Sequence, residues 1–228
     1  MTTDHPLDRP AWRALTTRQT AFALGDGNAR RFDPVYGPLT GAPDESPESL
    51  ADLAQLPHGP DGLWLVQADP VPAPPGMAVT GTGELVQMVA ERMVEGGTGI
   101  AFTPLTDADA AEMLALATLT RPGPFAEHTN RLGDFIGIRR DGVLIAMAGE
   151  RMRPEGFTEV SGICTLPEHR GRGLAAGLTR VVMKRILGRG EIPFLHSYAS
   201  NTGAIGLYES LGFRVRRTMN LTVLTKTL

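Results

Sequence analysis

The chain has 228 residues, 42% of them hydrophobic and 21% charged, and its formal net charge is −3. This composition is typical of a soluble globular protein with material for a large core, and the weak net charge argues against nucleic-acid binding. The longest apolar run, "GVLIAMAG", is far shorter than the ~20 residues that cross a bilayer, and "MTTDHPLDRPAW" lacks the apolar middle of a signal peptide. We therefore expect a cytoplasmic protein without membrane contact. The single cysteine, Cys164, excludes an internal disulfide, and we expect no metal site.

Charge and proline are unevenly distributed along the chain. Residues 1–95 carry 13 acidic and 6 basic side chains, whereas residues 96–228 carry 12 acidic and 16 basic ones. The first part therefore has a charge of −7 and the second a charge of +4, and 12 of the 18 prolines precede residue 96. This shift predicts two domains, 1–95 and 96–228, joined near the glycine pair of "VEGGTGI". The basic excess of the second domain suits an anionic ligand.

The first region contains short predicted elements and no chemical motif. We expect a helix over residues 9–24, and a short helix in "SPESLADL" that Ser46 caps. "GLWLVQ" predicts a buried strand, "ADPVPAPPG" a linker and "GELVQMVAERM" (residues 83–93) a helix. We interpret this region as a supporting α/β extension.

The second region alternates strands and helices. "GIAFTPLT" predicts a strand, and Thr106 or Asp107 caps a helix through "DADAAEMLALATL". "DG" at residues 141–142 predicts a hairpin turn, and "TEVSGICTL" predicts a further strand. A helix over residues 174–187, the strand "IPFLHSYAS", the helix "NTGAIGLYESLG" and the strand "FRVRRTMNLTVL" complete the chain. This order predicts an α/β fold with a mixed sheet, that is, an α+β arrangement flanked by helices.

The stretch "HRGRGLAAG" (residues 169–177) places glycines and arginines at the start of the predicted helix. A helix N-terminus offers unpaired N–H groups and a partial positive charge, and glycines allow close backbone approach. Arginines add donors that suit phosphate oxygens, so the stretch favours a diphosphate site. A tight connection with solvated arginines is the alternative. A Walker loop is excluded because no Gly-Lys-Ser/Thr is present. The dinucleotide fingerprint is rejected because Glu191, its candidate ribose ligand, precedes the next strand.

The segment from Arg170 to Ala175 resembles the R/Q-x-x-G-x-G/A signature of the GNAT superfamily of N-acetyltransferases. The strand "ICT" precedes it, and "SNTGAIGLYESLGF" is similar to the family's second cofactor element. The resemblance covers residues 98–228 and implies a GNAT acyltransferase fold, with a central, splayed mixed sheet. We leave open that residues 1–95 are a degenerate second copy of this fold.

The resemblance implies that acetyl-CoA is the co-substrate and lies between the strands "VSGICT" and "FLHSYA", with no metal. The implied cofactor-binding residues are Ile163, Cys164, Thr165, Arg170, Gly171, Arg172, Gly173, Leu174, Ala175, Asn201, Ala204 and Tyr208. A helix N-cap is the simpler alternative role for Asn201.

Tyr208 is the candidate general acid, because a phenol can protonate the departing thiolate. Glu159 and His196 are the rival general bases, each acting directly or through water, and we expect partial burial to raise the pKa of Glu159. Cys164 offers a less favoured covalent route, since a buried thiol is usually inert.

The acceptor pocket is expected in "TRPGPFAEHTNRLG", with Phe125, Glu127, His128 and Asn130 as candidates. The acidic first region would attract a cationic amine. The predicted activity is acetyl-CoA-dependent N-acetyltransfer to a primary amine of a small molecule or peptide, directly within a ternary complex. The alternatives are a non-catalytic acyl-CoA sensor and an acyltransferase of the same fold with another acyl group or acceptor. The oligomeric state is left open, a homodimer included.

Overall fold

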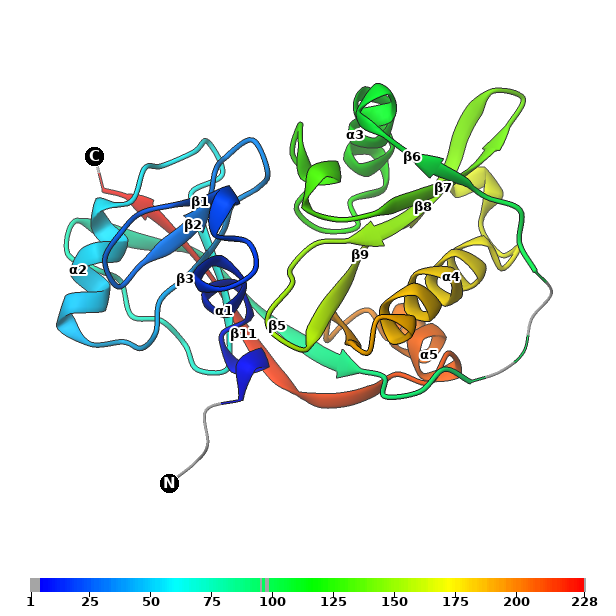
Figure 1. The fold of residues 1–228 in the computed structure, drawn as a ribbon. Coiled ribbons are helices and arrows are strands. Elements are labelled where there is room, and N and C mark those ends of the chain that lie inside the picture. The colour runs from blue at the N-terminus through cyan, green and yellow to red at the C-terminus, as the bar shows by residue number, and fades with distance from the viewer. Residues whose placement is uncertain (1–4, 95, 97–98, 228) are drawn as a thin grey trace.

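The computed structural model describes residues 5–94, 96 and 99–227, which form one mixed sheet with helices packed on it (Figure 1). Within these residues the sheet has eleven strands in the order β1-β2-β3-β4-β11-β5-β10-β9-β8-β7-β6. The strands are β1 (Ala23–Leu24), β2 (Arg30–Phe32), β3 (Leu39–Gly41), β4 (Leu63–Gln67), β5 (Met77–Val89), β6 (Thr103–Leu105), β7 (Phe135–Arg140), β8 (Val143–Glu150), β9 (Phe157–Thr165), β10 (Ile192–Tyr198) and β11 (Arg214–Lys226). The helices are α1 (Pro10–Thr16), α2 (Pro47–Gln55), α3 (Ala110–Thr120), α4 (Leu174–Gly188) and α5 (Thr202–Ser210).

The structure of the first region, residues 1–95, agrees only in part with the elements predicted for it. The expected helix over residues 9–24 ends at Thr16, because Thr17 leaves the helical region with φ −126° and ψ −93°. At this end of α1, the Thr16 hydroxyl donates a hydrogen bond to the Trp12 carbonyl and the Thr17 hydroxyl donates one to the Arg13 carbonyl. Ser46 caps α2 as predicted by accepting a hydrogen bond from the Ser49 N–H.

The helix predicted over residues 83–93 is wrong, since this segment forms the end of strand β5. β5 pairs antiparallel with both β10 and β11, so its backbone groups are satisfied on two sides. Leu85, Gln87 and Met88 are all buried there. Because side chains on both faces of the strand are buried, the sequence lacks the alternation of apolar and polar residues that indicates a strand. In Figure 1, β5 and β11 run from the group of elements around α1 and α2 to the group around α4 and α5.

The second region follows its prediction closely. Asp141 and Gly142, with φ values of 52° and 82°, form the turn of the β7–β8 hairpin. Leu178, Val182 and Ile186 form the buried stripe of α4, which packs on β8 and β9. The predicted strand over residues 99–106 is shorter, since β6 begins at Thr103.

The two regions share a hydrophobic core. Leu7, Leu15 and Phe32 pack in one cluster with Phe194 and Met219, although these residues come from opposite ends of the sequence. Full burial of each such side chain stabilises the fold by roughly 1.5–3 kcal/mol. The predicted domain boundary at residue 95 lies outside the described residues, and the division into two domains stays a prediction.

Candidate active site

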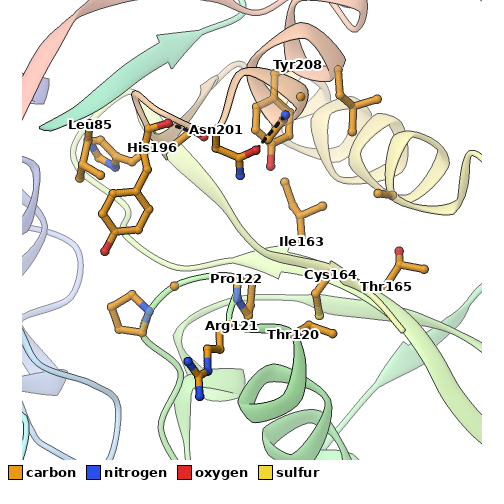
Figure 2. A pocket seen from close by; sticks show the side chains of 18 of the residues that line it. Leu85, Thr120, Arg121, Pro122, Ile163, Cys164, Thr165, His196, Asn201 and Tyr208 are labelled. Atoms are coloured by element: carbon orange, nitrogen blue, oxygen red, sulfur yellow. Dashed lines mark hydrogen bonds between the residues drawn. The ribbon is translucent and has the colours of Figure 1, made fainter. Parts of the chain in front are cut away.

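A cavity of about 600 Å³ opens where β9 and β10 diverge. Figure 2 shows part of its walls, with the Ile163 side chain directed towards Tyr208 and the Cys164 side chain directed towards Thr120 on the opposite side of β9. The predicted site residues that line it are Ile163, Cys164, Thr165, Arg170, Gly171, Gly173, Leu174, Ala175, His196, Asn201, Ala204 and Tyr208. Most of the predicted cofactor residues therefore lie around one space.

The cavity exists because two parallel strands separate after a short pairing. β9 and β10 pair only from Phe157 with Ile192 to Glu159 with Phe194. A bulge then shifts the register of β9 against β8, and Gly162 within it has a φ of +63°. A Cβ at Gly162 would lie 2.8 Å from the Phe135 ring, so glycine is required by both conformation and space. Beyond the bulge, the β9 backbone borders the cavity.

The N-terminus of α4 closes one end of the cavity. Gly171 and Gly173 both have a φ of +73°, and a Cβ at either position would meet nothing within 4 Å. Gly173 is the N-cap and provides no side-chain hydrogen bond to the first helical N–H groups. These amides and the helix dipole therefore face open space that suits an anion. Arg170 lines the cavity and donates to the Thr165 carbonyl, whereas Arg172 is exposed outside the lining and donates to the Glu168 carbonyl.

Two buried polar atoms at this end have no partner among the described residues. They are Thr165 Oγ1 and His169 Nδ1, and both residues line the cavity. Thr165 is only 8% exposed. A buried polar atom without a partner is costly, so both atoms fit a polar ligand such as the pantetheine and phosphate groups of coenzyme A.

Helix α5 provides two further lining groups. Asn201 is the N-cap, and its Oδ1 accepts a hydrogen bond from the Ala204 N–H at 3.2 Å (Figure 2). The N-cap role of Asn201 is confirmed. Burial raises the pKa of Tyr208 to about 12. The phenol is therefore protonated at neutral pH and is able to donate a proton into the cavity.

Glu159 lies behind the lining and is 1% exposed. Arg151 holds it with two hydrogen bonds of 2.8 and 2.9 Å, and His196 Nδ1 lies 2.9 Å from the same carboxylate. Burial by itself would raise the pKa of Glu159, but the charge of Arg151 and the hydrogen bonds from His196 and Arg151 outweigh it and lower the pKa to about 2. The raised pKa expected from the sequence is therefore wrong, because no sequence pattern indicated that Arg151 lies against this carboxylate.

The partners of Gln87 assign the protonation of His196. Gln87 Nε2 lies 2.8 Å from the Leu7 carbonyl and 3.0 Å from His196 Nε2, while its oxygen accepts from Arg216 at 2.6 Å. The amide nitrogen therefore faces His196, and His196 Nε2 accepts its hydrogen bond. The imidazole proton is on Nδ1 and is donated to Glu159, so both ring nitrogens are engaged.

The remaining candidates lie elsewhere or are unreactive. Burial raises the pKa of the Cys164 thiol to about 11, which disfavours the thiolate that a covalent route needs. Phe125, Glu127, His128 and Asn130 are not among the residues that line the cavity. Phe125 packs edge-on against Phe135, the Glu127 side chain is 73% exposed, and Asn130 donates to Asp107. Only the start of the predicted acceptor segment, residues 120–124, borders the cavity.

Several lining residues were not predicted from the sequence. They include Leu39, Trp64, Val66, Leu85, Arg151, Tyr198 and Leu221. The apolar ones resemble ordinary core positions of short strands, and no local motif distinguishes them. Within the described part of the chain, no group of three or more His, Cys, Asp or Glu residues could hold a metal ion. Nor does any helix in that part reach the length and hydropathy needed to span a bilayer.

Comparison with known proteins identifies the family. The FR47-like protein family model matches residues 135–222. The crystal structure of a GNAT-family protein from Novosphingobium aromaticivorans is 48% identical, covers 99% of this chain and 100% of that chain, and has a TM-score of 0.90. A GCN5-related N-acetyltransferase from Kribbella flavida shares the fold, with 19% identity, 93% and 95% coverage and a TM-score of 0.58. No curated protein was found that matches the chain. Because 48% of the residues are identical over nearly the whole length, the chain belongs to the GNAT family, and its predicted fold is confirmed.

Proposed function

We propose that the protein is an N-acetyltransferase that transfers the acetyl group of acetyl-CoA directly to a primary amine of a small molecule or peptide. The observation that carries this proposal is the single cavity shared by the divergent strands, the uncapped N-terminus of α4 and Tyr208. Acetyl-CoA supplies the activated thioester when it is bound. The full-length likeness to a GNAT-family protein supports the same conclusion.

Different residues around the cavity bind different parts of coenzyme A. The segment from Arg170 to Ala175 holds the pyrophosphate, because no side chain caps the start of α4 and Gly171 and Gly173 leave room for a ligand. The β9 backbone at Ile163, Cys164 and Thr165 borders the pantetheine arm, with Asn201 and Ala204 opposite. Arg172 contributes positive charge from outside the lining.

Tyr208 is the proton donor. In the transfer, the amine nitrogen forms a bond to the acetyl carbonyl carbon and the bond from that carbon to sulfur breaks. The Tyr208 hydroxyl donates its proton to the sulfur, the amine nitrogen loses one proton to solvent water, and a proton from that water returns to the Tyr208 phenolate to restore the phenol. A phenol with a pKa of about 12 remains available as a donor throughout the neutral range.

Glu159 and His196 act as positioning residues in this scheme and not as the general base. A carboxylate with a pKa of about 2 is a weak proton acceptor at neutral pH. The accepting nitrogen of His196 already binds Gln87. Glu159 instead fixes the orientation of Arg151 and His196, which both line the cavity.

Calorimetry with coenzyme A and acetyl-CoA, followed by thiol release in the presence of amines, tests the proposal. We expect heat on titration with coenzyme A, and its loss or strong reduction in an Arg170→Ala variant. Folded protein that gives no heat with either compound would refute the assignment. Binding of acetyl-CoA without thiol release in the presence of any amine would instead identify a sensor.

A further inference from the structure

The cavity extends beyond the cofactor residues to an apolar wall built mostly by the first region. Leu39 of β3 lies opposite Trp64 of β4, Val66 opposite Leu221 of β11, and Leu85 of β5 opposite Tyr198 of β10. Paired residues of neighbouring strands point to the same face of a sheet. We call these six residues the apolar wall, and all of them line the cavity.

The apolar wall lies on the acceptor side of the cavity. In Figure 2, Leu85 and His196 stand at one side, and Thr165 lies at the other, towards the start of α4. Because the start of α4 is the proposed pyrophosphate site, the wall borders the space left for the second substrate. Trp64 donates its indole N–H to the Asp61 carbonyl at 2.9 Å, which leaves the ring itself as an apolar surface.

The charges of the cavity are all of one sign. The ionisable groups that line it within the described residues are Arg121, Arg151, Arg170, His169, His196, Cys164 and two tyrosines, without any Asp or Glu. Glu159 is the nearest carboxylate behind the lining, and its oxygens already accept from Arg151, His196 and the Met152 N–H. A bound ammonium ion would therefore lie beside cations and apolar carbon with no carboxylate to pair with it, which is unfavourable.

This lining bears on an expectation drawn from the charge distribution. The acidic first region was expected to attract a cationic amine, but its contributions to the cavity are Leu39, Trp64, Val66 and Leu85. The acidic side chains of that region lie outside the lining. The cavity favours an amine that arrives without charge.

We infer, on the basis of the proposed function, that the acceptor is a weakly basic primary amine carried on an apolar or aromatic body and bound in its neutral form. The α-amino group beside an aromatic side chain is the model compound, because its pKa of about 8 lies well below the value of about 10.4 for a lysine side chain. At neutral pH the neutral fraction of such an α-amine exceeds that of lysine by roughly two orders of magnitude. An amine that binds neutral needs no side chain to take a proton before attack, which agrees with the engaged state of Glu159 and His196.

Three probes separate basicity from apolar contact. Phenylalanine amide has a weakly basic amine and an aromatic body, glycine amide has a similar amine without that body, and Nα-acetyl-lysine amide has a strongly basic amine. Thiol release at fixed acetyl-CoA gives kcat/KM for each probe. We expect phenylalanine amide to exceed each of the other two by roughly tenfold or more, the effect of one good apolar contact. Equal values for phenylalanine and glycine amides, or a preference for the lysine probe, would overturn the inference.

Two variants sharpen the result. Trp64→Ala should lower the ratio of kcat/KM for phenylalanine amide to kcat/KM for glycine amide roughly tenfold, without a change in the affinity for coenzyme A. Val143→Ala, which changes an apolar residue that is 53% exposed and outside the cavity, is the matched control. Tyr198→Glu places a carboxylate at the edge of the wall and should raise the relative activity on the lysine probe. Turnover of another amine with no turnover of phenylalanine amide contradicts this inference alone, whereas absence of coenzyme A binding, or of thiol release with every amine, contradicts the proposed function.

Discussion

Replacement of Glu159 by glutamine tests the buried ion pair that lies behind the cavity. Folding lowers the pKa of this carboxyl from 4.5 to about 2. Since one pKa unit corresponds to about 1.4 kcal/mol, the ionised carboxylate stabilises the folded state by about 3 kcal/mol at pH 7. Glutamine represents the protonated, uncharged carboxyl, so Glu159→Gln should lower the free energy of unfolding by that amount. Removal of one partner from a buried ion pair typically costs about 3–5 kcal/mol, which agrees.

The same reasoning fixes how this difference depends on pH. The folded-state pKa is lowered, so the stabilisation is complete above the unfolded-state pKa of 4.5 and is lost as the pH falls through the folded-state value of about 2. The difference between wild type and Glu159→Gln should therefore decline from about 3 kcal/mol at pH 7 to about 2 kcal/mol at pH 3.5. Urea unfolding followed by circular dichroism at both pH values measures it, provided that the m-value is unchanged. Glu84→Gln, at an exposed position of β5, is the control. A difference below about 1 kcal/mol at pH 7, or one that is constant between the two pH values, would refute the reasoning.

Three further changes test the site. Tyr208→Phe should lower kcat by about 10²-fold without altering the affinity for coenzyme A, and an unchanged kcat would remove Tyr208 as the proton donor. Gly173→Ala strains a residue with a φ of +73° and should weaken coenzyme A binding roughly tenfold by calorimetry, whereas Gly188→Ala at the other end of α4 should not. Cys164→Ala should retain its turnover, because burial raises the pKa of the thiol to about 11; loss of turnover with intact binding would restore the covalent route.

Local sequence patterns were sufficient to predict the elements whose structure depends on residues close together in the sequence. The "DG" turn requires two residues with positive φ, and Asp141 and Gly142 have them. The stripe of α4 was predicted because Leu178, Val182 and Ile186 recur at helical spacing and are buried together. The uncapped start of the same helix was predicted from its glycines, whose conformational freedom is a property of the residue itself.

Contacts between segments that are distant in the sequence explain the predictions that were wrong. "GELVQMVAERM" contains good helix formers, but β5 lies between β10 and β11 and takes its structure from their backbones. The pKa of Glu159 has the same origin. Arg151 is eight residues away in sequence, and only the turn between β8 and β9 brings its guanidinium against the carboxylate. A sequence pattern contains neither contact.

The acceptor side of the site was the least predictable part, because it requires strands from both regions at once. Leu39, Trp64 and Val66 each resemble a core residue of a short strand. Their role follows from the sheet order, in which β4 lies beside β11 and β3 beside β4, so that these residues line the cavity. The interpretation of residues 1–95 as a supporting extension therefore did not predict that Leu39, Trp64, Val66 and Leu85 line the cavity.

A chain of buried and half-buried polar contacts explains why the two regions have to fold together. Its members are Asp8, Arg216, Gln87, His196, Glu159 and Arg151. Each link leaves an unpaired polar group if its neighbour is removed, at a cost of about 1–3 kcal/mol. Residues 96–228 by themselves would lack β5, which separates β10 from β11 in the sheet, and would lack Gln87, which fixes the proton of His196 on Nδ1. The contacts made by the first region are therefore a condition for the tautomer and orientation of His196, and for the shape of the cavity.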